Sequence, residues 1–267
     1  MTPGVRTRER RARVGDTLWF AALCVAAAAL LWRGVGQLGY DWQWHRVLKY
    51  LGAWDAAGFV PGTLLRGTWV SLQLVASAFA LTVLLGLVAA LLQRSGSPVG
   101  RAMARGYVEV VRNTPLLIQV YLVYFALAPV LGIDRFWAAV LALALFEGAF
   151  AAEIFRAGIE GVERGQWEAA ATLSLSPTDT YRFVVLPQAV TLVLPPLVNL
   201  SVALVKHSAI VSVIAVAELT TAGRNAVSET FLAFEIWFTV AAIYLVLITA
   251  MSAGARALEQ RLRRGRR

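Results

Sequence analysis

The amino-acid sequence predicts an all-α protein, a polytopic transmembrane helical bundle with about six spans. Of the 267 residues, 58% are hydrophobic and only 15% are charged, and the mean hydropathy is +0.64. A soluble domain of this size has too little interior to cover so much apolar surface. Several apolar runs also approach the length of about 20 residues that a helix needs to cross a bilayer. Composition and run length together therefore indicate a membrane protein.

Six apolar windows are long enough to span a membrane, and short polar intervals separate them. We predict spans at about 17–35, 69–92, 114–133, 136–155, 184–205 and 234–254. The first window follows five arginines, as in a secretory signal peptide, but Trp32-Arg33-Gly34 is a poor cleavage site. We therefore expect a retained signal anchor. Residues 36–68 mix aromatic and charged side chains, which favours an interfacial amphipathic segment outside the membrane.

The distribution of Lys and Arg predicts the orientation. With the N-terminus inside and six alternating spans, 18 of the 25 basic residues lie on the inner side. Both termini should then be cytoplasmic, in a multi-pass membrane protein. Residues 1–59 would hold the N-terminus, the first anchor and the outside segment. Residues 60–256 would form the main transmembrane domain, and 257–267 a basic cytoplasmic tail.

Several chemistries are excluded by the residues themselves. The only lysines, Lys49 and Lys206, lie in no phosphate-binding G-x-x-x-x-G-K-[ST] loop. Cys24, His45 and His207 are scattered, so no metal site is expected. The net charge of +9 comes from basic clusters beside the apolar runs, where anionic lipid attracts them. We expect membrane lipid as a partner and no nucleic acid, no enzyme activity, and an energy source outside the chain.

The segment 156–183, the longest inner loop between spans, carries the clearest functional pattern. Residues 165–179 (GQWEAAATLSLSPTD) read as two short helices with a turn between them. Ser176 is a predicted N-cap, Pro177 fits the first helical position, and Asp179 stands three residues after the cap. The alanines would leave a smooth helix face that another protein could approach closely. An ordinary amphipathic helix on the membrane surface is the alternative that this pattern alone leaves open.

The sequence resembles a known family at this point. Glu168-Ala169-Ala170, followed by Leu186-Pro187, is similar to the EAA loop of ABC importer permeases. Further stretches resemble the polar amino-acid branch, the histidine/glutamine-type permeases: 67–72 (GTWVSL), 112–119 (RNTPLLIQ), 152–159 (AEIFRAGI), 165–167 (GQW) and 204–214 (LVKHSAIVSVI). The resemblance covers about residues 60–256. It implies the fold of a type I ABC importer permease and a location in the bacterial cell (inner) membrane.

The resemblance implies partners and a mechanism. Two permeases, identical copies or paralogues, pair in the membrane, and ATP-binding cassette ATPase subunits dock below. A periplasmic or extracellular solute-binding protein delivers the amino-acid substrate. The chain needs no cofactor of its own, because ATP is used by the partner. The ATPase-coupling loop would include residues that the motifs mark: Gly165, Gln166, Trp167, Glu168, Ala169, Ala170 and Ser174.

Two positions depart from the family pattern. The family usually has Gly where Ser174 stands, four residues after Ala170, because that residue ends a helix with positive φ. Ser in that conformation costs on the order of 1 kcal/mol, unless the loop turns without it. The family often has an acidic or amide residue at the position of His207, so no substrate is inferred from that position.

Polar residues inside the apolar windows are the candidates for a translocation pathway. Pro187, Pro195 and Pro196 should bend the fifth span, and such breaks persist where protein or water satisfies the backbone. We therefore expect residues 188–206 beside the path, with the polar lining drawn from Asn199, Ser201 and Lys206. A merely kinked packing helix is the alternative.

Glu147 lies near the middle of the window 136–155, where a charged side chain is costly unless it is paired or wetted. We expect it to face the protein interior. It either attracts the cationic part of a substrate or hydrogen-bonds to a neighbouring helix. Glu147 is also the feature that keeps open an ion-gradient-driven secondary transporter or channel, the alternative function. A membrane scaffold or intramembrane enzyme is a third reading.

Overall fold

The computed structural model describes residues 19–27, 29–30, 33–34, 39–56 and 58–264. These residues fall into two units, which divide between Trp44 and His45. In the first unit, residues 19–27 are helical, and the ring of Trp42 stacks on Trp44 with centroids 5.8 Å apart. The predicted first span, 17–35, lies partly outside the described residues. The division precedes Val47, Tyr50 and Leu51, because these side chains pack with the second unit.

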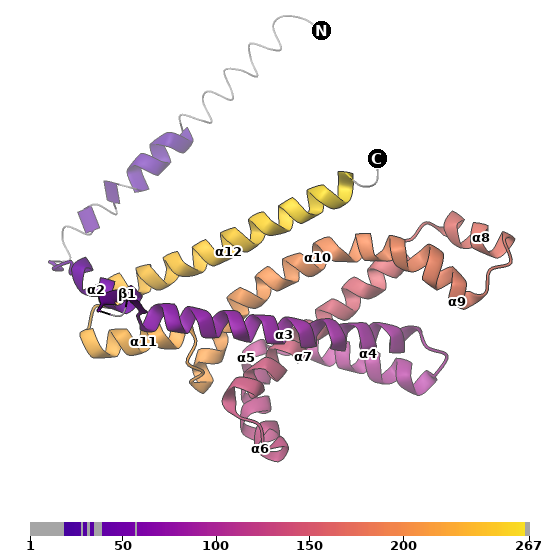
Figure 1. The fold of residues 1–267 in the computed structure, drawn as a ribbon, viewed down its shortest axis with the longest axis horizontal. Helices are drawn as coiled ribbons and strands as arrows, with labels where there is room; N and C mark the ends of the chain where they lie inside the picture. Colours follow the sequence, from indigo (N-terminus) through magenta and orange to yellow (C-terminus); the bar gives the residue numbers. More distant parts are fainter. Residues whose placement is uncertain (1–18, 28, 31–32, 35–38, 57, 265–267) are drawn as a thin grey trace, which may run out of the picture. The chain divides into compact units, whose positions relative to one another are not determined.

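The second unit is an α-helical bundle with one small hairpin, as Figure 1 shows. Its first half contains α2 (Trp44–Leu51), β1 (Gly52–Asp55), β2 (Gly58–Pro61), α3 (Thr63–Arg94), α4 (Pro98–Arg112), α5 (Leu116–Tyr121), a π-helical turn η1 (Leu122–Leu127) and α6 (Ala128–Leu131). Its second half contains α7 (Arg135–Glu160), α8 (Arg164–Thr172), α9 (Pro177–Asp179), a π-helical turn η2 (Thr180–Val185), α10 (Leu186–His207), a 3₁₀ segment η3 (Ser208–Ile214), α11 (Leu219–Thr230) and α12 (Ala233–Arg264).

The core of this unit is the crossing of α3 and α7. Small residues let the two backbones approach: a Cβ added at Gly86 of α3 would lie 2.5 Å from the Cβ of Ala151 on α7. Such contacts between small residues are typical of helix packing in membranes, where dispersion rather than water exclusion drives association. Alanines of α7 and aliphatic side chains of α3, α5 and α10 fill the space around the crossing.

The membrane-spanning character predicted from the sequence agrees with the helices of the second unit. Four described helical stretches are long and apolar enough to cross a bilayer: Thr63–Arg94, Arg135–Glu160, Pro177–Ile214 and Ala233–Ala257. A fifth is the pair Pro98–Arg112 and Leu116–Leu131, if this bent pair counts as one span. The polytopic helical bundle is therefore confirmed, with four or five spans among the described residues. The first of the six predicted spans lies partly outside the described residues.

The interval between the second and third predicted spans is helical, which the sequence did not suggest. Ser97 caps α4 by accepting a hydrogen bond from the backbone N–H of Gly100 at 3.1 Å, and Pro98 fits the first helical position. Pro115 then interrupts the helix, and the chain bends by 111° into α5. The short turn at residues 95–97 lets α4 return alongside α3, and α4 also packs on α7.

Part of the segment 36–68 forms a small hairpin, which the sequence did not suggest. The strands β1 and β2 pair in antiparallel register, with Trp54 opposite Phe59 and Gly52 opposite Pro61. The aromatic rings of Trp54 and Phe59 pack edge to face at 5.6 Å, and cross-strand aromatic pairs of this kind stabilise hairpins. Gly52 admits no larger residue, because an added Cβ would lie 2.4 Å from the ring of Phe59.

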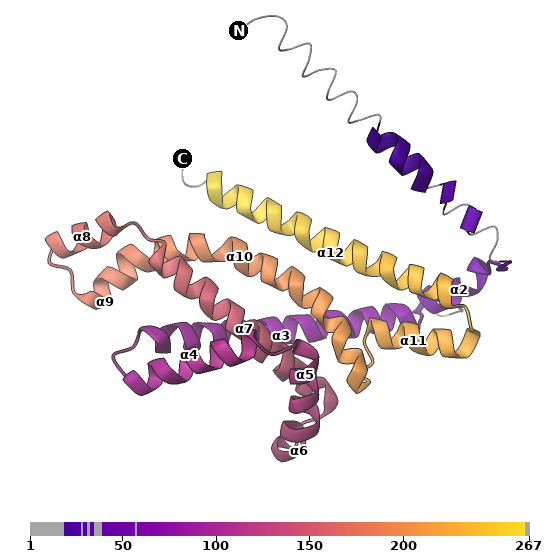
Figure 2. The same ribbon diagram turned by 180° about the vertical axis from the view of Figure 1, so that it is seen from behind.

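The proline-containing span is continuous. The α-helix α10 runs through Pro195 and Pro196 without a break, and the departures from α geometry lie at its two ends, in η2 and η3. The helix is therefore not interrupted at Pro195 and Pro196, and the irregular turns precede and follow it, while the predicted bend of this span stays a prediction. Figures 1 and 2 show α8 and α9 at one end of this unit and α11 at the other.

Candidate functional site

The loop between α7 and α10 folds as two helical pieces joined by a tight turn, as predicted. Helix α8 ends with Ser174 at φ 54°, and the N–H of Leu175 donates to the carbonyl of Ala170 at 3.1 Å. Ser174 thus takes the left-handed conformation at which glycine is favoured, at a cost on the order of 1 kcal/mol. Ser176 caps α9 by accepting from the N–H of Asp179 at 3.1 Å.

One side of α8 is anchored to its own chain. The side chain of Ala170 is only 2% exposed. The ring of Trp167 packs edge to face on Tyr181 of η2 at 5.4 Å, and Gln166 accepts a hydrogen bond from Gln188 of α10 at 3.3 Å. Helix α8 therefore contacts η2 and the start of α10, which belong to the Pro177–Ile214 helical stretch.

The other side of α8 is exposed. Gly165, Glu168 and Ala169 face solvent, and Leu173 at the end of the helix is 74% exposed. Glu168 pairs with Arg164 on the same helix at 3.1 Å, but both side chains are largely exposed, so the pair contributes little to stability. Of the alanine pair, Ala169 is thus available to a partner, whereas Ala170 fixes the helix in place.

Glu147 lies at the middle of α7, 12 residues or about 18 Å from its first residue, Arg135. Its side chain is 4% exposed, and its carboxylate oxygen Oε1 lies 2.5 Å from Nδ1 of His207 at the end of α10. The ring of His207 also packs edge to face on Phe146 at 5.8 Å. The carboxylate of Glu147 therefore faces the protein interior and contacts α10. Its partner, His207, stands at one of the positions where the sequence departs from the family pattern.

The other predicted pathway residues lie on α10, but not on one face. Asn199 and Lys206 are both exposed and seven residues apart, so they share a face about 10 Å apart along the helix. Ser201 follows Asn199 by two residues and points to the opposite side, and its hydroxyl donates to the carbonyl of Val198 at 2.7 Å. A single stripe cannot contain both Asn199 and Ser201.

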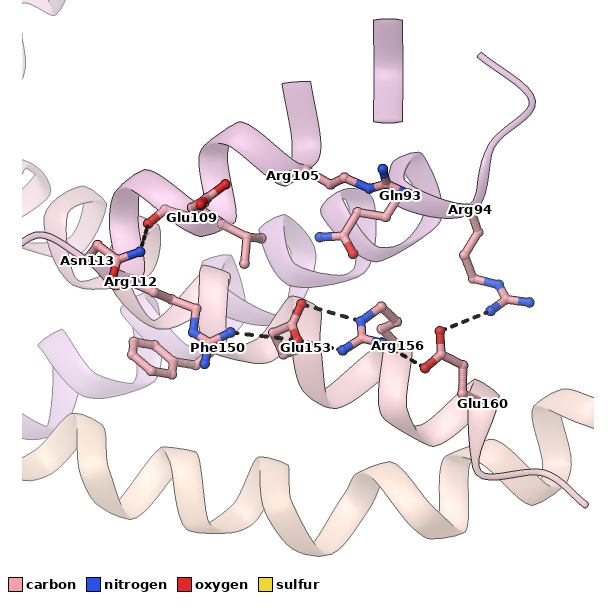
Figure 3. A pocket seen from close by; sticks show the side chains of 11 residues that line it. Gln93, Arg94, Arg105, Glu109, Arg112, Asn113, Phe150, Glu153, Arg156 and Glu160 are labelled. Carbon is pink, nitrogen blue, oxygen red and sulfur yellow. Dashed lines mark hydrogen bonds and ion pairs between the residues drawn. The ribbon is translucent and has the colours of Figure 1, made fainter. Parts of the chain in front are cut away.

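A polar groove that sequence reasoning missed lies between the ends of α3, α4 and α7, with a volume of about 900 Å³. Figure 3 shows alternating charges along it. Glu153 contacts Arg112 at 3.7 Å and Arg156 at 2.7 Å, Arg156 contacts Glu160 at 2.7 Å, and Glu160 contacts Arg94 at 3.8 Å. The pairing of Glu153 with Arg156, three residues apart on one helix, was predicted, and that of Arg156 with Glu160, four apart on the same helix, follows from the same spacing rule. The contacts of Arg112 and Arg94 with this helix could not be predicted from spacing.

A second unforeseen group is buried at the other end of the unit. Glu218 is fully buried and caps α11, accepting from the N–H groups of Thr220 at 2.7 Å and Thr221 at 2.8 Å. It also accepts from the hydroxyl of Tyr244 on α12 at 3.0 Å. Burial raises the pKa of the Glu218 carboxyl above its ordinary value, although these hydrogen bonds oppose the shift. The sequence signal was an acidic residue just before a helix.

The transport character of this arrangement is decided by comparison with known families. Residues 82–264 match the family described as binding-protein-dependent transport system inner membrane component. The chain belongs to this family. It is therefore a multi-pass inner membrane component of a transport system that also includes a binding protein and an ATPase.

The relatives of this inner membrane component are amino acid permeases. It is 35% identical over 213 residues to the glutamine transport system permease protein of Escherichia coli (strain K12), covering 79% of this chain and 97% of that protein. It is also 35% identical over 202 residues to the arginine transport system permease protein of Bacillus subtilis (strain 168), covering 75% and 92%.

Solved structures agree with the fold. A crystal structure of an amino acid ABC transporter with histidines matches at 36% identity with a TM-score of 0.75, covering 83% of this chain and all of that one. An inward-facing structure of the MetNI methionine ABC transporter matches at 20% identity and a TM-score of 0.63, covering 74% and 95%, which concerns the fold alone.

Proposed function

We propose that this chain is a permease subunit of an ATP-driven amino acid importer, forming part of the translocation pathway and docking on a separate ATPase through α8. The observation that carries the proposal is the geometry of α8. One side is locked to η2 and α10 through Trp167 and Gln166, and the other presents Gly165, Ala169 and Leu173 to solvent. Displacement of the exposed side is thereby passed to a membrane-spanning helix.

The ATP would be bound by the partner, because the sequence contains no phosphate-binding loop. Ala169 has no side chain beyond Cβ, so a groove on the ATPase can approach the α8 backbone closely. The exposed Leu173 adds apolar area to the same surface, and exposed apolar side chains that gather on a protruding segment mark interaction sites. Both termini are proposed to be cytoplasmic, on the side of the docked ATPase.

The pathway assignment rests on Lys206. It precedes His207, which touches Glu147 at the midpoint of α7, so Lys206 lies deep along the spans and is nevertheless exposed. A lysine facing lipid at the centre of a bilayer costs about 2.5–3.5 kcal/mol. The face of α10 that bears Asn199 and Lys206 is therefore proposed to line a wet pathway completed by a second permease, an identical copy or a paralogue.

The proposed substrate is a polar amino acid delivered by the solute-binding protein. The two relatives named above are described as glutamine and arginine permeases. Lys206 suits the carboxylate of an amino acid. Glu147 suits its ammonium or guanidinium group, but His207 competes for the same oxygen. An ion-gradient mechanism has no comparable support, because the family depends on a binding protein.

The test is co-purification of the tagged chain with its ATPase, followed by uptake in proteoliposomes. Ala169→Arg places a long cation on the proposed docking face, so we expect normal membrane insertion, loss of the bound ATPase and loss of uptake. Ala257→Arg is the matched control, because Ala257 is an exposed alanine at the end of another span. Full co-purification and uptake by Ala169→Arg would contradict docking through α8.

A further inference from the structure

Arg94 is the last residue of α3. It lies between the charged groove and residues 161–185, which contain α8, α9 and η2 and are called the α8 loop below. Its guanidinium is forked: Nη2 donates to the hydroxyl of Tyr181 at 3.2 Å, and Nη1 lies 3.8 Å from Glu160 at the end of α7. Tyr181 in turn packs on Trp167 of α8. One side chain thus touches the loop with one nitrogen and a membrane-spanning helix with the other.

No other hydrogen bond or ion pair joins α3 to residues 161–185 in the part of the chain that the structure describes. The helices α3 and α7 form the core crossing of the bundle. A movement of the loop relative to this core must therefore stretch or break the contact between Arg94 and Tyr181. The loop is also tied to α10 through Gln188, and its Val162, Trp167, Tyr181 and Val185 pack in an apolar cluster with Ile159 of α7 and Ala189 of α10. The contact between Arg94 and Tyr181 is thus the polar link from the loop to α3, beside this apolar packing on α7.

Beyond Arg94, the contacts continue as an alternating series. Glu160 binds Arg156, Arg156 binds Glu153, and Glu153 reaches Arg112 on α4, as Figure 3 shows. The guanidinium of Arg112 also stacks near the ring of Phe150 at 5.5 Å. The series connects α3, α7 and α4 along the wall of one groove. If Arg94 moves away, Glu160 loses a neighbouring positive charge, which alters its interaction with Arg156.

The setting suits a contact that is made and broken. The side chains of Arg94 and Glu160 are 31% and 48% exposed, and exposed ion pairs hold a fold together only weakly. The groove of about 900 Å³ leaves the Arg94 side chain room to swing. Arginine is suited to bridging two acceptors, because its planar fork presents several donors in fixed directions.

We propose that Arg94 is a positioning residue that transmits movement of the α8 loop to α3 and α7 by holding Tyr181 and Glu160 together in one state and releasing Tyr181 in the other. This inference rests on the proposed function, because it assumes that an ATPase moves α8. It goes beyond that function by naming a side chain through which movement of the α8 loop reaches α3 and α7.

The experiment measures uptake per ATP hydrolysed in proteoliposomes that contain the full complex and the binding protein. Arg94→Gln removes both contacts, and Tyr181→Phe removes only the acceptor hydroxyl while keeping the ring on Trp167. We expect both variants to assemble, to hydrolyse ATP, and to lower the ratio by about fivefold or more, the lower end of the range that coupling free energies span. Arg94→Lys should also lower it, because one ammonium group cannot bridge both partners.

Arg105→Gln is the matched control. Arg105 lines the same groove and carries the same charge, but it makes no hydrogen bond or ion pair with any described residue, so its loss should leave the ratio unchanged. An unchanged ratio in either Arg94→Gln or Tyr181→Phe overturns the proposal. If Arg94→Gln fails to assemble, Tyr181→Phe alone decides. Failure of the unaltered complex to couple uptake to ATP would instead refute the proposed function.

Discussion

Removing the imidazole of His207 should destabilise the bundle in a measurable way. In His207→Ala the carboxylate of Glu147, 4% exposed at the middle of α7, loses the partner that lies 2.5 Å from it. Breaking a fully enclosed pair costs about 3–5 kcal/mol. Because the His207 side chain is 35% exposed, water can reach the vacated space, and we expect a smaller loss of about 2–3 kcal/mol.

Glu147→Gln offers the matched comparison. The amide keeps the size of the side chain and a hydrogen bond to His207 but removes the charge, so the expected loss is about 1 kcal/mol. With a shift of about 2–4 °C per kcal/mol for a chain of this size, Tm should fall by about 4–12 °C in His207→Ala and by about 2–4 °C in Glu147→Gln. In the double variant, the loss should be smaller than the sum of the two single losses.

The assay is thermal unfolding of the purified protein in detergent, followed by size-exclusion chromatography. Uptake by the same variants tests the pathway assignment: Glu147→Gln should weaken transport, most strongly for basic amino acids. Additive losses in the double variant would show that the two side chains do not interact, and the reasoning about this pair would be refuted. Unchanged transport with unchanged substrate preference would leave Glu147 as a packing residue.

Three further outcomes are expected. Gly86→Val should destabilise the protein by about 1–3 kcal/mol or prevent folding, because its Cβ would clash with Ala151. Gly106→Ala should stabilise α4 by about 0.5–1 kcal/mol, because nothing lies within 4 Å of the added Cβ. Thermal unfolding of the two variants tests both values. Ser174→Gly should raise stability by about 1 kcal/mol without loss of uptake, because Ser174 holds a positive φ, and a lower Tm would contradict this. Since burial raises the pKa of Glu218, its ionisation opposes folding, and stability should fall as pH rises from the ordinary value of 4.5 through the raised pKa. Glu218→Gln should flatten this fall, and an equally steep pH profile in that variant would show that another group is responsible.

The sequence predicts well the features that depend on local order. Apolar run length identifies the spans of the second unit, the Ser176 cap follows from residue type and spacing, and Glu153 pairs with Arg156 one turn away. These features need no knowledge of which helices meet. Residue type and spacing alone therefore predict them.

The features that the sequence did not predict depend on contacts between distant segments. Glu147 and His207 are 60 residues apart, and Arg94 and Tyr181 are 87 apart, so no spacing rule connects them. The proline positions alone did not locate the irregular turns, because α10 continues through Pro195 and Pro196 while the π-helical and 3₁₀ turns lie at its ends. Loss of a backbone donor marks where a helix is weakened, and the surrounding packing decides whether it breaks.

The most direct test of the central claim is uptake of radiolabelled polar amino acids, including glutamine and arginine, by proteoliposomes that contain this chain, its ATPase and the binding protein. We predict that uptake requires ATP on the side of the membrane that holds the ATPase and the binding protein on the opposite side. Uptake should persist when ionophores dissipate all ion gradients. Uptake that ignores ATP and stops with the ionophores would contradict the account.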